Sequence, residues 1–331
     1  MKTVLWVPCA MLAAMSSASD ARVARLIRVD GNLAVRIKTR TLLLHGRPIS
    51  TPARTFPKSV DPAKTFHDWL KDDERWGGHK EANELRYMDR NGGGVGAEYA
   101  DFYEVKHVGT FAVMNLRYMG PSGEPTGPQI LVRQRPGKDV VEWVRRLSEL
   151  PSMLYRSPPK RIYEFKRRRY VLEGDGVYGL NPDGTAGKLF ADIPDKSVPA
   201  GLADGRYIVF VADEMQGGND QWVHALDLAR GKSFKVIRIP SYEGGKPPPL
   251  YFADSYIGDS PYLIFSRKEE DPAVGRYFAL HLPDGARRPI AKVLWPLGDY
   301  GIEEQTDRVL VYSLKSGRLV QTLPLPKARK S

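Results

Sequence analysis

The sequence contains a single cysteine, Cys9, and this scarcity excludes several kinds of chemistry. Cys9 lies in an apolar segment near the N-terminus, so a chain that has lost this segment has no thiol at all. Disulfides, thiolate nucleophiles and metal sites with cysteine ligands are then excluded. Stability must come from a hydrophobic core, which a chain of 331 residues with 42% hydrophobic residues can supply.

Long hydrophobic runs are also missing: no apolar segment approaches the ~20 residues of a membrane-spanning helix. With 27% charged and 10% aromatic residues, the composition is neither disordered nor coiled-coil in type. The 31 glycines and 26 prolines indicate many turns. The formal net charge of +11 makes the protein basic. The composition therefore describes a turn-rich, basic, globular protein.

Motifs of known catalytic chemistry are absent as well. None of the six histidines is spaced as a helical zinc pair, and the sequence has no GxSxG nucleophile elbow and no phosphate-binding Walker loop. We therefore expect no metal, no cofactor and no catalytic residue.

The first 21 residues have the pattern of a secretory signal peptide. Lys2 precedes the apolar stretch VLWVPCAMLAAM and the small-residue segment SSASDA. Cleavage after Ala18 or after Ala21 fits equally well. The sequence thus predicts a bacterial periplasmic or secreted protein, and export argues against nucleic acid as a partner.

A hairpin pattern recurs in the second half of the chain. An apolar strand ends in a small residue and a leucine, a glycine-containing turn follows, and a second strand begins after a basic residue. The leucines are 46, 54 and 34 residues apart, near the ~40–50 residues of a four-stranded propeller blade. They are Leu180, Leu226, Leu280 and Leu314.

These repeats predict an all-β fold, a β-propeller of about six to seven blades in one domain, residues 22–331. The last interval is short, so we expect the N-terminal stretch 25–46 to close the propeller with a strand. Apolar spacing predicts short helical insertions near residues 62–76 and 139–150, with strands between them. Two alternatives stay open: an α+β N-terminal domain followed by a β-repeat domain, and a β-sandwich.

The segment His224-Ala-Leu-Asp-Leu-Ala-Arg-Gly-Lys232 resembles the repeats of quinoprotein-type (PQQ-like) β-propellers, in which Ala-Leu-Asp precedes a Thr-Gly-Lys turn. The resemblance covers about residues 160–326 and implies the propeller fold. The tryptophan that follows each turn in that family is replaced here by other apolar residues. The resemblance therefore implies no quinone cofactor and no functional residue.

A cluster of basic residues, RSPPKRIYEFKRRRY at 156–170, is the one local feature that suggests a site. One interpretation is a solvated strand edge protected against pairing. The other is a partner-binding surface for an acidic protein or another anionic component of the envelope. If the run is one strand, Lys166 and Arg168 share one face while Arg167 and Arg169 share the other. The candidate contact residues are Arg161, Lys166, Arg167, Arg168 and Arg169.

The leading hypothesis is an exported, non-catalytic binding or scaffold protein of the cell envelope, such as an assembly factor or a toxin-neutralising immunity protein. The alternative is a propeller-fold hydrolase or lyase that acts on an acidic glycan with carboxylates from different blades.

Overall fold

A computed structural model describes residues 23–45, 95–119, 125–126, 128–138, 141–148, 150, 160–193, 197–212, 221–240, 250–252, 257–271 and 275–326. All regular elements in these ranges are β-strands, which confirms the all-β prediction. No helix within these ranges has the length and apolar character needed to cross a membrane. The predicted signal peptide, residues 1–21, and the predicted helix near 62–76 lie outside the described residues.

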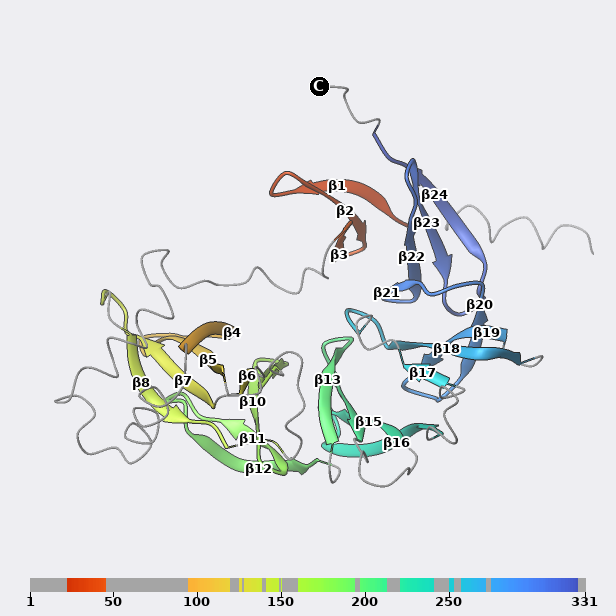
Figure 1. Ribbon diagram of the computed structural model, residues 1–331. Helices are drawn as coiled ribbons and strands as arrows, with labels where there is room; N and C mark the ends of the chain where they lie inside the picture. The colour runs from red at the N-terminus through yellow and green to blue at the C-terminus, as the bar shows by residue number, and fades with distance from the viewer. Residues whose placement is uncertain are drawn as a thin grey trace, which may run out of the picture. The chain divides into compact units, whose positions relative to one another are not determined.

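The chain divides into two compact units (Figure 1). The central unit comprises residues 51–248, and the terminal unit comprises residues 1–50 and 249–331. The strands of the central unit are β4 (Val95–Val105), β5 (Gly109–Met119), β6 (Pro125–Thr126), β7 (Gln129–Gln134), β8 (Val141–Arg146), β9 (Ile162–Phe165), β10 (Arg168–Glu173), β11 (Gly176–Leu180), β12 (Ala186–Asp192), β13 (Ser197–Ala203), β14 (Tyr207–Ala212), β15 (Gln221–Asp227) and β16 (Lys232–Ile239).

The strands of the terminal unit are β1 (Arg25–Val29), β2 (Asn32–Ile37), β3 (Arg40–Leu43), β17 (Leu250–Phe252), β18 (Tyr262–Asp271), β19 (Gly275–His281), β20 (Arg287–Ile290), β21 (Trp295–Leu297), β22 (Tyr300–Glu304), β23 (Arg308–Ser313) and β24 (Leu319–Pro324).

The described strands form six antiparallel sheets, and in four of them four consecutive strands pair in chain order. These four meanders are β9–β12, β13–β16, β17–β20 and β21–β24. The sheet β4–β8 runs β4-β5-β7-β8 with β6 beside β5, and β1–β3 form a three-stranded sheet. Successive four-stranded meanders are the repeat of a propeller-like fold, and six sheets agree with the predicted six to seven blades.

The four leucines occupy equivalent places, because each lies on or directly after the third strand of a meander. Leu226, Leu280 and Leu314 are buried, whereas Leu180 is half-buried. Each following turn is closed by the same bond, in which a side-chain oxygen accepts the backbone N–H two residues ahead. The acceptors are Asp183, Asp227, Asp284 and Ser316.

Adjacent sheets of the central unit bury apolar side chains against each other. Tyr103, Phe111 and Leu131 of the sheet β4–β8 pack with Ile162 and Val171 of the sheet β9–β12. A second cluster joins the sheets β9–β12 and β13–β16; it includes Tyr163, Tyr170, Leu172, Val177, Ile208, Phe210 and Leu226. The core of this unit therefore lies between sheets, where the alternating apolar residues of each strand meet.

The part of the N-terminal stretch 25–46 that the structure describes, residues 25–45, contains the strands β1–β3 as predicted, but its role differs from the prediction. The last meander has four strands of its own, so it needs no borrowed strand. The N-terminal strands form a separate sheet, in which Val35 and Leu42 pack against Leu297 and Val311. The short interval from Leu280 to Leu314 still leaves room for a complete four-stranded meander, because β20, β21 and β22 are only 4, 3 and 5 residues long.

The predicted helix near 139–150 is wrong: Val141–Arg146 is strand β8. A bulge in its pairing with β7 leaves Val144 without a direct partner, because Val132 pairs with Trp143 while Leu131 pairs with Arg145. This extra residue changes the strand's alternation. Val144 and Leu147 therefore contact the same core cluster, at a spacing that resembles one face of a helix.

Candidate functional site

The basic cluster forms a β-hairpin, not one strand. Phe165 pairs with Arg168, and Lys166 and Arg167 form the two-residue turn between β9 and β10. Both turn residues have positive φ, 48° at Lys166 and 65° at Arg167, as in a type I′ turn. The expected two-faced arrangement of Lys166–Arg169 is therefore wrong, since the turn places these residues around a hairpin tip.

The residue types of this turn are unusual for its backbone. Type I′ turns strongly favour Asn-Gly or Asp-Gly. Two other turns of this chain have positive φ at both positions, and they contain the favoured pair: Asp30-Gly31 and Asp204-Gly205. A left-handed conformation costs a residue with a Cβ atom roughly 1–2 kcal/mol. Lys166-Arg167 therefore stores backbone strain that an Asp-Gly pair would relieve.

The side chains at the tip are open to solvent. Lys166, Arg167 and Arg168 are exposed, and none has a carboxylate partner among the residues that the structure describes. The ammonium of Lys166 lies 5.4 Å from the centre of the Phe165 ring. Three adjacent positive charges are thus available to an external anion.

Arg169 differs from these three because it anchors the hairpin. Its Nε donates to Glu164 Oε2 at 3.1 Å, and its guanidinium lies 5.4 Å from the ring centre of Tyr103 on β4. Burial raises the pKa of the Tyr103 phenol well above its ordinary value, so the ring stays neutral beside this cation. Arg169 therefore ties the tip to the neighbouring sheet.

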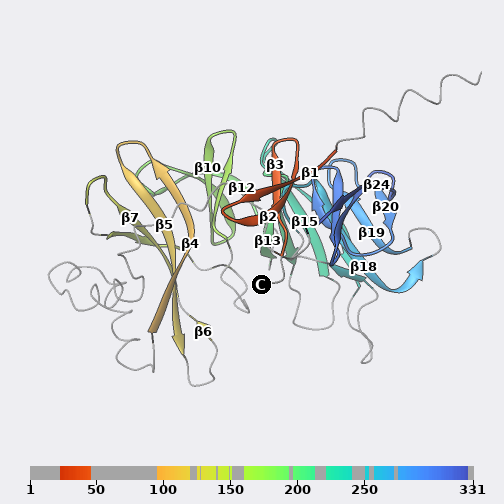
Figure 2. The ribbon, with the colours of Figure 1, turned by 90° about the horizontal axis from the view of Figure 1, so that it is seen from above.

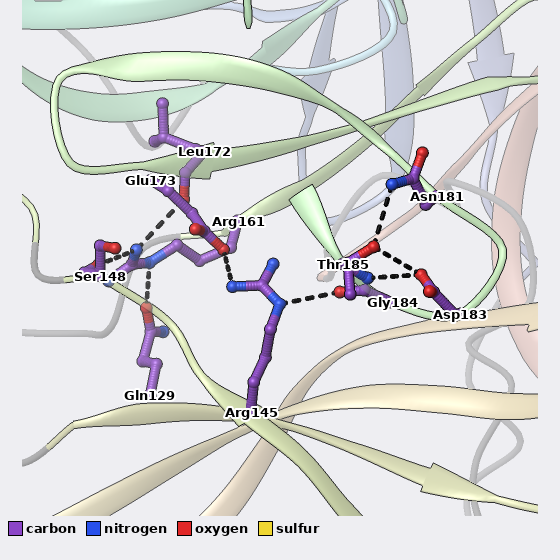
Figure 3. Close-up of polar contacts among 10 residues, drawn as sticks. All are labelled: Gln129, Arg145, Ser148, Arg161, Leu172, Glu173, Asn181, Asp183, Gly184 and Thr185. Carbon is purple, nitrogen blue, oxygen red and sulfur yellow. Dashed lines mark hydrogen bonds and ion pairs between the residues drawn. The ribbon is translucent and has the colours of Figure 1, made fainter. Parts of the chain in front are cut away.

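Arg161 is not part of the surface. It is only 4% exposed, and its guanidinium donates to Gln129 Oε1 and to the carbonyl oxygens of Ser148, at 2.6 Å, and Leu172, at 3.1 Å (Figure 3). Its side chain joins the two sheets from inside, and the expectation of a partner contact at this residue is corrected.

The backbone at the start of β9 is held by a buried carboxylate. Asp101 accepts the N–H groups of Arg161, at 2.7 Å, and Ile162, at 3.0 Å. Burial raises the pKa of Asp101, although Lys160 and these two N–H groups act in the opposite direction. The hairpin is therefore anchored at its base, where β9 begins.

A second arginine connects the same two sheets. Arg145 on β8 pairs with Glu173 on β10, and its Nε donates to Gly184 O at 2.8 Å (Figure 3). Gly184 lies in the turn Asn181–Thr185, which Asp183 closes by accepting from Thr185. This network could not be predicted from the sequence, because its members are far apart in the chain and no motif links them. It joins the sheet β4–β8 to the sheet β9–β12.

The described residues contain no group of three or more histidine, cysteine, aspartate or glutamate side chains that could hold a metal ion.

Comparisons with known proteins identify no family. No family model matches the sequence, and no curated protein matches it. Among solved structures, an oligogalacturonate lyase in complex with manganese is 10% identical over 71% of this chain and 76% of that chain, with a TM-score of 0.33. BamB from Moraxella catarrhalis is 15% identical over 65% of this chain and 62% of that chain, with a TM-score of 0.29.

TolB from Acinetobacter baumannii is 11% identical over 91% of this chain and 79% of that chain, with a TM-score of 0.26. Similarities at this level transfer no function to this chain.

Proposed function

We propose that this protein is an exported, non-catalytic binding protein of the cell envelope that recognises an anionic surface on another macromolecule. The recognition element is the hairpin tip Lys166–Arg168, with Arg169 as its anchor. Its role is that of an assembly factor or of an immunity protein that neutralises a toxin.

The observation that carries the proposal is the pair of left-handed residues Lys166 and Arg167. The chain places Asp-Gly at two other turns with positive φ at both positions, so a relaxed turn is available to it. Backbone strain concentrates where function requires it. Two long cationic side chains at strained positions, both without a carboxylate partner among the described residues, fit a contact surface better than a passive turn.

The charge of the whole chain supports the same role. A formal net charge of +11 attracts an acidic partner from a distance and raises the rate of encounter. The tip then supplies local contacts, since guanidinium groups donate paired hydrogen bonds to carboxylates. The binding that results is sensitive to salt, because the Debye length is about 8 Å at physiological ionic strength.

The test is capture of the partner from envelope extract with wild type and with R167A/R168A. We expect the double variant to retain about a tenth or less of the captured partner, a loss that corresponds to at least about 1.4 kcal/mol. High salt should release the partner from wild type. A matched control is R287A/R288A, which removes two adjacent exposed arginines from β20 in the terminal unit. Equal capture by all three proteins would contradict the proposal.

Export is tested separately by N-terminal sequencing of the protein made in its native host. We expect a mature chain that begins at Ser19 or Arg22, after cleavage at Ala18 or Ala21. A soluble cytoplasmic protein that retains Met1 would contradict this part of the proposal.

A further inference from the structure

Three turns of the central unit bring unpaired cations to the same end of two neighbouring sheets. The turn Lys106–Val108 joins β4 and β5, the turn at Arg135–Lys138 joins β7 and β8, and Lys166–Arg167 joins β9 and β10. The first two lie at one end of their sheet, because Thr110 at the start of β5 pairs with Gln134 at the end of β7. Figure 2 shows the hairpin β4–β5 and the hairpin of β10 turning in the same direction.

Close contacts hold the three turns together. Gly109 has a φ of 134° and lies so near β7 that a Cβ atom would be 2.2 Å from the carbonyl oxygen of Gln134. Only glycine permits this approach, which draws the first turn against the second. Arg169 covers Tyr103 at 5.4 Å and so holds the third turn beside β4.

The exposed cations of these turns form a set that we name the cationic end. Each is exposed and has no carboxylate partner within the described ranges, in contrast to Arg135, which pairs with Glu142 at 2.9 Å. The cationic end consists of Lys106, Lys138, Lys166, Arg167 and Arg168. Lys106 and Lys138 are far from the basic cluster in sequence, so only the fold brings them to the same end as the tip.

We infer that the cationic end binds an extended acidic polypeptide segment that reaches all three turns, an inference that rests on the proposed function. A lone small anion contacts only one turn, whereas a chain with repeated carboxylates contacts several at once, and each contact adds to the affinity. Arg167 and Arg168 match carboxylates with their planar donor groups.

The surroundings favour a polypeptide over an acidic glycan or a membrane. Sugar rings stack on exposed aromatic faces, but Tyr103 and Phe111 are buried at this end and Phe165 is half-buried beneath the Lys166 ammonium. A membrane surface is held by apolar side chains as well as by cations. The two large hydrophobic residues that are exposed in the described chain, Leu189 and Leu319, lie on β12 and β24 and not at these turns.

The experiment titrates labelled oligoglutamate, polygalacturonate and vesicles of anionic phospholipid into the full-length mature protein. Two double variants are compared with wild type: K106A/K138A for the first two turns and R167A/R168A for the third. K188A/K235A is the matched control, since it removes two exposed lysines from the outer strands β12 and β16. Thermal unfolding of each protein verifies that it is folded.

We expect each of the two variants to raise the Kd for oligoglutamate about three- to tenfold, while the control leaves it unchanged. If R167A/R168A weakens binding and K106A/K138A does not, the extended surface is wrong and the proposed function survives. If neither variant weakens binding, the extended surface and the proposed function are both wrong. Tighter binding of polygalacturonate or vesicles than of oligoglutamate, with the same response to the variants, overturns the polypeptide partner.

Discussion

At the scale of single residues, neighbours in the basic cluster have opposite environments. Arg161 is enclosed by three acceptors, whereas Arg168 is exposed. Nothing in the local sequence distinguishes Arg161 from the other basic residues. Its burial depends on contacts with Asp101 and Gln129, which belong to a different sheet. Candidate contact residues could therefore be predicted from the run of charge, but their separation into buried and exposed members could not.

This difference gives a prediction for stability. Arg161→Ala leaves two buried acceptors, on Gln129 and Leu172, and a partly buried one on Ser148 without their donor. Hydrogen bonds to charged groups contribute roughly 1.5–3 kcal/mol each. We expect the free energy of unfolding, measured with urea, to fall by about 3 kcal/mol or more. Arg168→Ala serves as the control and should leave the urea midpoint unchanged. Equal midpoints for the two variants would show that Arg161 does not hold the sheets together.

At the scale of elements, the hairpins were predictable because their information is local. The turns after Leu180, Leu226, Leu280 and Leu314 carry their own closing side chain, and the structure forms a hairpin at each. Strand β8 was mistaken for a helix because its bulge depends on pairing with β7, which the sequence of β8 alone does not specify. The left-handed Lys166–Arg167 turn was missed for a similar reason, since neither residue type indicates positive φ.

The turn after Leu226 gives a prediction for pH dependence. Asp227 accepts two bonds from Arg206, at 2.8 and 2.6 Å, and one from the N–H of Ala229 at 2.9 Å. Burial acts to raise the pKa of Asp227, but these hydrogen bonds outweigh it, so the pKa lies below its ordinary value. The folded state then binds fewer protons than the unfolded state, and the stabilisation present above about pH 4 is lost as the pH falls through the folded pKa.

We therefore expect Asp227→Asn to destabilise the protein at neutral pH and to reduce this loss on the acid side. The measurement is the free energy of unfolding of both proteins from neutral pH to about pH 3. The difference between them should shrink as the pH falls. A constant difference over this range would mean that the carboxylate charge of Asp227 contributes nothing.

At the scale of the whole molecule, the repeat organisation followed from sequence while the contacts between sheets did not. Leucine spacing predicted successive four-stranded meanders, because each meander is built from neighbouring segments of chain. The N-terminal sheet packs on the last meander through Val35, Leu42 and Leu297, a pairing of opposite ends of the chain that no local pattern specifies. The cationic end likewise depends on which turns meet, and it extends the binding surface beyond the basic cluster.

The most direct test of the binding surface at the hairpin tip replaces the strained turn with a relaxed one. K166N/R167G installs the favoured pair at the two positions of positive φ and removes two cations. We expect two results in the same sample: a free energy of unfolding equal to or higher than wild type, by up to about 2 kcal/mol, and a Kd for oligoglutamate raised about three- to tenfold. A variant that binds as tightly as wild type would contradict the claim that the strained turn is retained for its charges.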